Sequence, residues 1–319
     1  MHKGFNRAFA GLPREYRDVS LSLFRIMVPA LIIIRLLEGI GFISWLGTVL
    51  APLMAWVGLP GELALVWVTT MATNIYTGLL IFFTQPDLNL TVAQVTTLGG
   101  MMLIAHNLIV EGGIARSAGV RLRFTLLWRV GGSLLYGILL FHLYGMLDWL
   151  QTPWTPAWQP EAADPSLKAW AWSQLQGLAI IAGVIALLLV VLRLLRWIGV
   201  EALLQRMLAP CLNLLGIGRQ AASLILVGLT LGLAFGGGLL IREARQGHIP
   251  PRDVTAAICF LGLGHSVIED TLLILAMGAD ISGVLVFRLV LTLVFSMLLA
   301  RVLKAMPDTR LGLITRPLR

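Results

Sequence analysis

The chain has 319 residues, of which 58% are hydrophobic and 13% are charged, and its mean hydropathy is +0.87. This composition excludes an ordinary water-soluble domain, and apolar runs of roughly 20 residues, long enough to cross a bilayer, recur along the chain. A net charge of +8 would suggest nucleic-acid binding in a soluble protein. Here, basic loops facing anionic cytoplasmic lipid account for the charge. We therefore expect an all-α polytopic membrane protein that contacts membrane lipid and binds no nucleic acid.

The apolar segments, taken in chain order, predict six spanning helices. A basic tail precedes the first segment, and no small-residue cleavage site follows it, so we interpret this segment as a retained helix rather than a signal peptide. Two short amphipathic segments, 44–57 and 202–215, share an LAP…G pattern and are expected to lie at the membrane interfaces. The six predicted spans are residues 23–43, 91–116, 120–145, 175–198, 252–277 and 283–305.

One sequence pattern occurs in both halves of the chain. The stretch RLLEGIGFISWLGTVLAPLMAWVG begins at Arg35, and the related stretch RLLRWIGVEALLQRMLAPCLNLLG begins at Arg193. Further along, His106 matches His265 at nearly the same spacing. Because order and spacing persist through most of each half, we predict two copies of one unit. The predicted units are residues 1–160 and 161–319.

The Lys and Arg content of the loops predicts that the two halves are inverted. Basic loops stay in the cytoplasm, and equivalent loops of the two halves carry opposite charge bias. Each half has four apolar segments, yet inversion requires an odd number of crossings. Residues 61–83 and 220–241, interrupted by TNIYTG and GLAFGGGLL, are therefore predicted to form re-entrant hairpins, with full helices packed along glycines as the alternative. Both termini are then cytoplasmic.

Polar residues cluster near the midpoint of the fifth predicted span, in the stretch GLGHSVIEDTLL. On a continuous helix, His265 and Glu269 would share one face at i, i+4. Ser266 and Asp270 would form the neighbouring stripe. Ionisable residues at this depth in a membrane mark functional sites. A satisfied packing network within the helix bundle is the alternative.

The first half carries a related but incomplete set of polar residues. His106, Asn107 and Glu111 match the histidine, serine and aspartate of the second half, whereas Val110 takes the place of the glutamate. The predicted site is thus asymmetric, with the glutamate of the second half as its main carboxylate. The tips of the predicted hairpins would complete the cavity with the polar groups of Asn74, Thr77 and Gly237.

Two arginines also fall within apolar sequence. Arg288 lies about as far beyond the predicted turn near residue 279 as Asp270 lies before it, which puts the two at equal depth on antiparallel helices. Glu111 and Arg129 are placed alike in the first half. Because an unpaired charge at this depth is costly, we predict two structural ion pairs, Asp270–Arg288 and Glu111–Arg129.

The stretch GLGHSVIEDTLLILAMGAD, followed by a helix that contains Arg288, resembles the nucleoside-recognition, or Gate, domain family of bacterial multi-spanning proteins. That family includes the spore maturation membrane proteins and the gates of the ferrous-iron transporter B family, and it is related in architecture to concentrative nucleoside transporters. The resemblance implies an inverted-repeat fold with hairpins. This chain departs from the iron-transporter gates, since it has no G-protein domain and carries His and carboxylate in place of cysteine at the polar positions.

These features favour a membrane permease or secondary transporter with a polar site at the membrane midplane. The solute could be a nucleoside-like polar molecule, with H⁺ or Na⁺ as coupling ion and Glu269 as the protonated or cation-binding group. It could equally be a divalent metal held by His265, Glu269 and His106. The alternatives are a lipid-phosphate transporter and a non-transporting assembly or signalling protein.

We expect no enzymatic activity, and the bound ions that the sequence leaves open are a coupling H⁺ or Na⁺ and a divalent metal. No recognised catalytic motif is present, and the two cysteines, Cys211 and Cys259, predict neither a disulfide nor a metal cluster. The expected location is the bacterial inner membrane, as a multi-pass protein with both termini inside. Homo-oligomers are compatible with this reading.

Overall fold

The computed structural model describes residues 11–85, 89–156, 166–213 and 216–315, and within these ranges every regular element is helical. The predictions of an all-α fold and of six helical stretches long and apolar enough to cross a membrane are confirmed for the described residues. The six helical stretches long and apolar enough to cross a membrane are Leu12–Gly39, Val92–Ser117, Leu122–Met146, Leu167–Trp197, Pro251–Ala276 and Ser282–Ala305.

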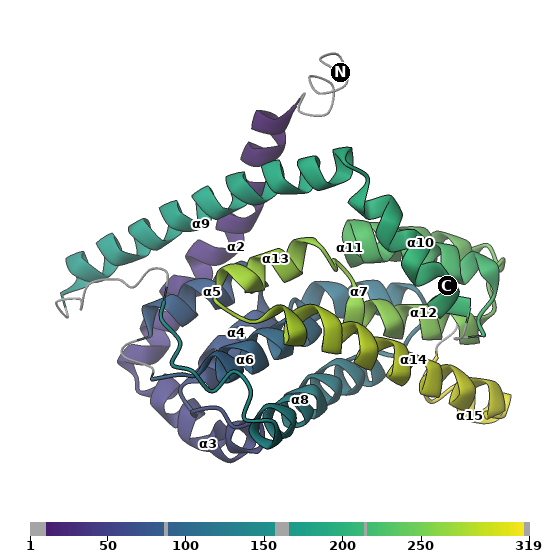
Figure 1. Cartoon of the computed structure of the whole chain (residues 1–319), viewed down its shortest axis with the longest axis horizontal. Coiled ribbons are helices and arrows are strands. Elements are labelled where there is room, and N and C mark those ends of the chain that lie inside the picture. Colours follow the sequence, from purple (N-terminus) through teal and green to yellow (C-terminus); the bar gives the residue numbers. More distant parts are fainter. Residues whose placement is uncertain (1–10, 86–88, 157–165, 214–215, 316–319) are drawn as a thin grey trace.

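Several of these stretches are divided into separate helices (Figure 1). In chain order the helices are α2 (Leu12–Gly39), α3 (Phe42–Trp56), α4 (Leu63–Ala72), α5 (Ile75–Thr84), α6 (Val92–Ala105), α7 (Leu108–Ser117), α8 (Leu122–Met146), α9 (Leu167–Trp197), α10 (Val200–Asn213), α11 (Arg219–Arg245), α12 (Pro251–Gly264), α13 (Glu269–Ala276), the π-helical segment η1 (Ser282–Phe287), α14 (Arg288–Ala305) and α15 (Asp308–Leu311). The expected interfacial segments are present as the short helices α3 and α10.

The apolar stretches differ in how deeply they are buried, and this separates a centre from a periphery. In α6–α7 and in α12–α13, 72% of the most apolar window is buried, compared with 17% in α2 and in α9. In Figure 1, α9 crosses α2 along one side of the molecule, away from the centre. The two stretches that contain the predicted polar sites therefore form the core of the protein.

Both central stretches are broken at their histidines. α6 ends at His106 and α12 ends at His265, and each histidine has extended backbone angles. The residues that follow, Asn107 and Ser266, have positive φ angles of 52° and 50°. A left-handed residue ends a helix, because it turns the next N–H away from the helical ladder. The expected continuous helices over 91–116 and 252–277 are therefore wrong, and so is the shared i, i+4 face of His265 and Glu269.

The two predicted hairpins have different outcomes. In the first, α4 and α5 are separate helices that pack together, and Gly78 is needed there because a Cβ atom would lie 1.9 Å from Thr70 Oγ1. In the second, residues 220–241 lie within one helix, α11, so the predicted break in GLAFGGGLL is not seen. Glycine weakens a helix by only about 1 kcal/mol per residue, and a Gly-rich run does not by itself force a break.

Trp154, in the described residues that follow α8, packs against the turn after α13. The Trp154 indole donates a hydrogen bond to the Met277 carbonyl over 3.0 Å. A Cβ atom added at Gly278 would lie 2.4 Å from the indole nitrogen of Trp154, and Gly278 has a φ of 95°, so the position favours glycine. Trp154 thereby holds this segment against the turn that follows α13.

Candidate functional site

The two histidines meet at the centre of the protein. His106 and His265 are 6% and 2% exposed, and their Nε2 atoms lie 3.1 Å apart. Because each histidine ends the first helix of a broken pair, the two breaks lie against each other. The two histidines, which occupy matching positions 159 residues apart in the sequence, are thus in direct contact.

Backbone carbonyls fix the orientation of both imidazole rings. Nδ1 of His265 lies 2.6 Å from the Leu261 carbonyl oxygen, and Nδ1 of His106 lies 3.0 Å from that of Leu103. A carbonyl oxygen only accepts hydrogen bonds, so each Nδ1 carries the proton and donates it. In the neutral rings, the lone pairs of both Nε2 atoms therefore point into the space between the histidines.

Two carboxylates surround this space. Glu111 Oε1 lies 3.3 Å from His106 Nε2 and 3.2 Å from His265 Nε2. Asp270 Oδ2 lies 3.6 Å from His106 Nε2 and has no hydrogen-bond partner of its own. Glu111 and Asp270 occupy the first turns of α7 and α13, where a helix N-terminus favours negative charge. We call His106, His265, Glu111 and Asp270 the central cluster.

The two buried arginines cap the broken helices. Arg129 Nε donates to the Ile104 carbonyl over 2.8 Å, and Arg288 Nε donates to the Leu263 carbonyl over 3.0 Å. These carbonyls belong to the last turns of α6 and α12, where the helix break leaves oxygens without an intrahelical donor. A cation is favoured at such an end by the helix dipole. Each arginine is 1% exposed, so these bonds replace those that water would otherwise make.

Only one of the two predicted ion pairs is formed. Arg129 Nη1 contacts Glu111 Oε2 directly. Arg288 instead gives its second donor, Nη2, to the His265 carbonyl over 2.8 Å. Among the described residues, no ion pair joins Arg288 to Asp270, because the helix break brings the His265 carbonyl within reach of the guanidinium. The predicted direct ion pair between Asp270 and Arg288 is therefore absent, although the two charges still attract each other, and Asp270 faces the histidines.

The remaining predicted residues lie around the central cluster or away from it. Asn107 and Ser266 form the breaks themselves, and the Asn74 side chain accepts a hydrogen bond from the Thr77 backbone N–H over 2.9 Å at the start of α5. Glu269 is exposed, and the Tyr76 side chain is its hydrogen-bond partner. Gly237 lies within α11, and its surroundings are outside the described part of the chain.

Sequence reasoning therefore chose the wrong acid. A continuous helix makes Glu269 the neighbour of His265, but the break at Ser266 turns Glu269 outward and Asp270 inward. The repeat identifies the acid of the cluster better than helical periodicity does. Glu111 and Asp270 are 159 residues apart, like the two histidines, whereas Glu269 has no acidic counterpart in the first half. An acid present in both halves is the one that the structure places in the cluster.

Neighbouring helices hold both breaks in place through the backbone. The Asn107 N–H donates to the Thr70 carbonyl of α4 over 3.0 Å. The Val267 N–H donates to the Leu229 carbonyl of α11 over 3.1 Å. Non-helical backbone at membrane depth must be satisfied within the protein, and these two bonds supply partners that the broken helices lack. Movement of α4 or α11 would therefore act directly on the central cluster.

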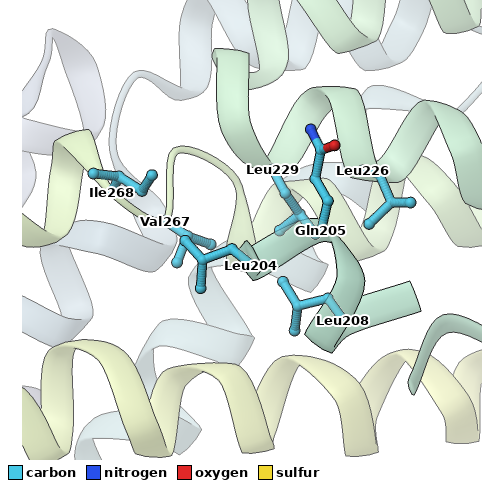
Figure 2. Close-up of a pocket in the computed structure, with 7 residues that line it drawn as sticks. All are labelled: Leu204, Gln205, Leu208, Leu226, Leu229, Val267 and Ile268. Carbon is cyan, nitrogen blue, oxygen red and sulfur yellow. The ribbon is translucent and has the colours of Figure 1, made fainter. Parts of the chain in front are cut away.

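In the described part of the chain, one small cavity lies beside the second break and another beside Glu111. One is lined by Gln205 and by apolar side chains of α10, α11 and the second break, among them Val267 and Ile268 (Figure 2). The other lies beside Glu111 and Arg129 and reaches Cys259. Each has a volume of about 10 Å³. This is room for about one water molecule, whereas pockets for organic ligands are on the order of hundreds of Å³.

Comparison with known proteins supports the family resemblance in the first half of the chain. Residues 20–121 match the model of the Gate family, described as nucleoside recognition. An uncharacterized membrane protein of Bacillus subtilis (strain 168), YvoD, is 28% identical over 312 residues, which cover 95% of this chain and 97% of the relative. No solved structure matches. The chain is thus a membrane protein with several transmembrane helices, and its residues 20–121 match the nucleoside-recognition Gate model.

Proposed function

We propose that this Gate-domain membrane protein is a secondary transporter, in which a small polar solute or ion crosses at the central cluster. The observation that carries the proposal is the meeting of two broken helices at His106 and His265, with Glu111 and Asp270 beside them. Secondary transporters bind their cargo where interrupted helices leave free ends and polar groups near the bilayer midplane. Burying ionisable side chains inside a membrane is costly, and such residues mark pathways for solutes or ions.

The proposed architecture is an inverted repeat in the bacterial inner membrane, with both termini in the cytoplasm and α4–α5 as a re-entrant hairpin. Matching contacts support the repeat: Arg129 to the Ile104 carbonyl and Arg288 to the Leu263 carbonyl each span 25 residues. The opposite charge bias of equivalent loops supports the inversion. α11 departs from this symmetry, since it has no break matching that between α4 and α5.

The Gate match and the membrane relative favour a transporter over an enzyme. The choice of cargo is a further proposal. The two cavities, about 10 Å³ each, are far smaller than a nucleoside. The cavity beside Glu111 and Arg129 has room for an ion, whereas a nucleoside or a lipid phosphate bound there would require opening of the helices around the breaks.

Uptake by proteoliposomes tests the proposal. Purified protein is reconstituted, and uptake of divalent metals, nucleosides and a lipid phosphate is measured with and without a pH gradient. We expect saturable uptake of one of these classes, with loss of uptake when His106 and His265 are both replaced by glutamine. The variant His142→Gln is the matched control, because His142 is exposed on α8, away from the cluster. Folded protein that moves no member of the panel would favour an assembly or signalling role instead.

A further inference from the structure

The central cluster has the composition and geometry of a metal site. We propose that His106 Nε2, His265 Nε2, Glu111 Oε1 and Asp270 Oδ2 together bind one divalent transition-metal ion. The inference rests on the proposed function for its second claim, that this ion is the transported cargo. Binding itself is argued from the four atoms and their surroundings, and it can be tested separately.

Four of the six separations among these atoms are close to those of tetrahedral coordination. Metal–nitrogen and metal–oxygen bonds of about 2.0–2.2 Å put neighbouring ligand atoms of a tetrahedron about 3.3–3.6 Å apart. The measured separations are 3.1 Å between the histidine nitrogens, 3.2 and 3.3 Å from these to Glu111, and 3.6 Å from His106 to Asp270. Ligand atoms of His106, His265 and Asp270 all lie within 4.8 Å of one another. Small shifts of side chains would complete the site.

The histidines are in the tautomer that binds metal. Both Nδ1 atoms donate to carbonyl oxygens, of Leu103 and Leu261, and this leaves the lone pairs of both Nε2 atoms free. Two lone pairs that face each other at 3.1 Å repel unless a cation lies between them. Metal-ligating histidines are commonly fixed in this way, through a second-nitrogen bond to a carbonyl.

The carboxylates are placed to complete the site. Arg129 contacts Oε2 of Glu111 and leaves Oε1 toward the histidines. Asp270 Oδ2 is buried without a hydrogen-bond partner. Arg288 does not supply one, because its Nε and Nη2 groups donate to the carbonyls of Leu263 and His265. An unpartnered buried carboxylate oxygen is unfavourable, and coordination of a cation would satisfy it. Two imidazoles with two carboxylates suit Zn²⁺, Fe²⁺, Co²⁺ or Mn²⁺ better than Mg²⁺ or Ca²⁺.

The adjacent acids Asp270 and Glu269 provide a matched pair of variants for the test. Asp270 lies in the cluster, whereas Glu269, the next residue along the chain, is exposed and pairs with Tyr76. Asp270→Asn removes one ligand oxygen and nearly preserves shape. Glu269→Gln makes the same kind of change outside the cluster. The substitutions His265→Gln and His142→Gln form a second such pair, inside and outside the cluster.

The experiment is equilibrium dialysis of the full-length protein in detergent against Zn²⁺, after removal of metals with a chelator. We expect about one Zn²⁺ per chain in the unaltered protein and in both outside variants, with affinity about tenfold or more lower in both inside variants. Excess Mg²⁺ should not displace the Zn²⁺. Co²⁺ bound at the site should show the visible absorption of tetrahedral coordination.

Folding of the variants is checked by thermal unfolding with and without Zn²⁺. Metal-free Asp270→Asn should unfold at or above the temperature of the metal-free unaltered protein, since its carboxylate oxygen has no hydrogen-bond partner to lose, yet Zn²⁺ should stabilise it less. The metal site would be overturned if the unaltered protein bound no Zn²⁺, as expected when the two histidines share only a proton. It would also be overturned if both inside variants bound Zn²⁺ as tightly as the unaltered protein. Binding without uptake refutes the transport proposal alone, and uptake of a nucleoside without Zn²⁺ binding refutes the metal site alone.

Discussion

The contrast between the two buried arginines yields a quantitative prediction. Arg129 and Glu111 contact each other with side-chain exposures of 1% and 7%, whereas Arg288 donates to two carbonyls and forms no ion pair with Asp270 among the described residues. Opposite charges about 4 Å apart attract by about 4 kcal/mol at an effective dielectric constant of about 20. Part of this attraction is offset by desolvation, so we expect a coupling energy of about 2–3 kcal/mol for Glu111 and Arg129. For Asp270 and Arg288 we expect less than about 1 kcal/mol.

Double-mutant cycles measure both coupling energies. The variants are Glu111→Gln and Arg129→Met in one cycle and Asp270→Asn and Arg288→Met in the other, each made singly and together. Unfolding in mixed micelles, followed by tryptophan fluorescence, gives the free energy of unfolding for each variant. The reasoning would be refuted by equal coupling in the two cycles, or by a coupling below about 0.5 kcal/mol for Glu111 and Arg129.

Three further predictions concern backbone geometry and are checked by unfolding measurements of the same kind. Gly278→Ala should cost about 1–3 kcal/mol, because a Cβ would lie 2.4 Å from the Trp154 indole at φ 95°, whereas Gly113→Ala, with no atom within 4 Å, should not destabilise. Ser266→Val should cost about 1–2 kcal/mol at its φ of 50°, and Ser266→Gly should cost nothing; equal effects would contradict the strained break. Asn74→Ala should cost about 1 kcal/mol through loss of the α5 cap, and Asn74→Ser should restore most of it.

The spanning helices could be predicted from the sequence because their signal is local. An apolar run of sufficient length is stable as a helix in a membrane wherever it lies, so all six were found. The breaks at His106 and His265 lack such a signal. Neither histidine is followed directly by proline or glycine. Each break depends on partners from elsewhere in the chain: the Arg129 and Arg288 side chains donate hydrogen bonds, and the carbonyls of Thr70 in α4 and Leu229 in α11 accept them.

The central cluster was predictable in part. The repeat brought out both histidines, and the structure places them in contact. The choice of Glu269 over Asp270 followed from helical periodicity, which fails where the helix is broken. At GLAFGGGLL the glycine content predicted a break that is not formed, because the backbone continues as one helix, α11. At the two histidines, tertiary hydrogen bonds rather than local residue preference decide where the helix ends.

The most direct test of the account is Zn²⁺ uptake into proteoliposomes, compared between Asp270→Asn and Glu269→Gln. If the ion crosses at the central cluster, the unaltered protein and Glu269→Gln take up Zn²⁺ at similar rates, and Asp270→Asn loses about 90% or more of the uptake at sub-saturating Zn²⁺, in line with a tenfold weaker site. Equal uptake by the two variants, or loss of uptake in Glu269→Gln alone, would contradict transport through the central cluster.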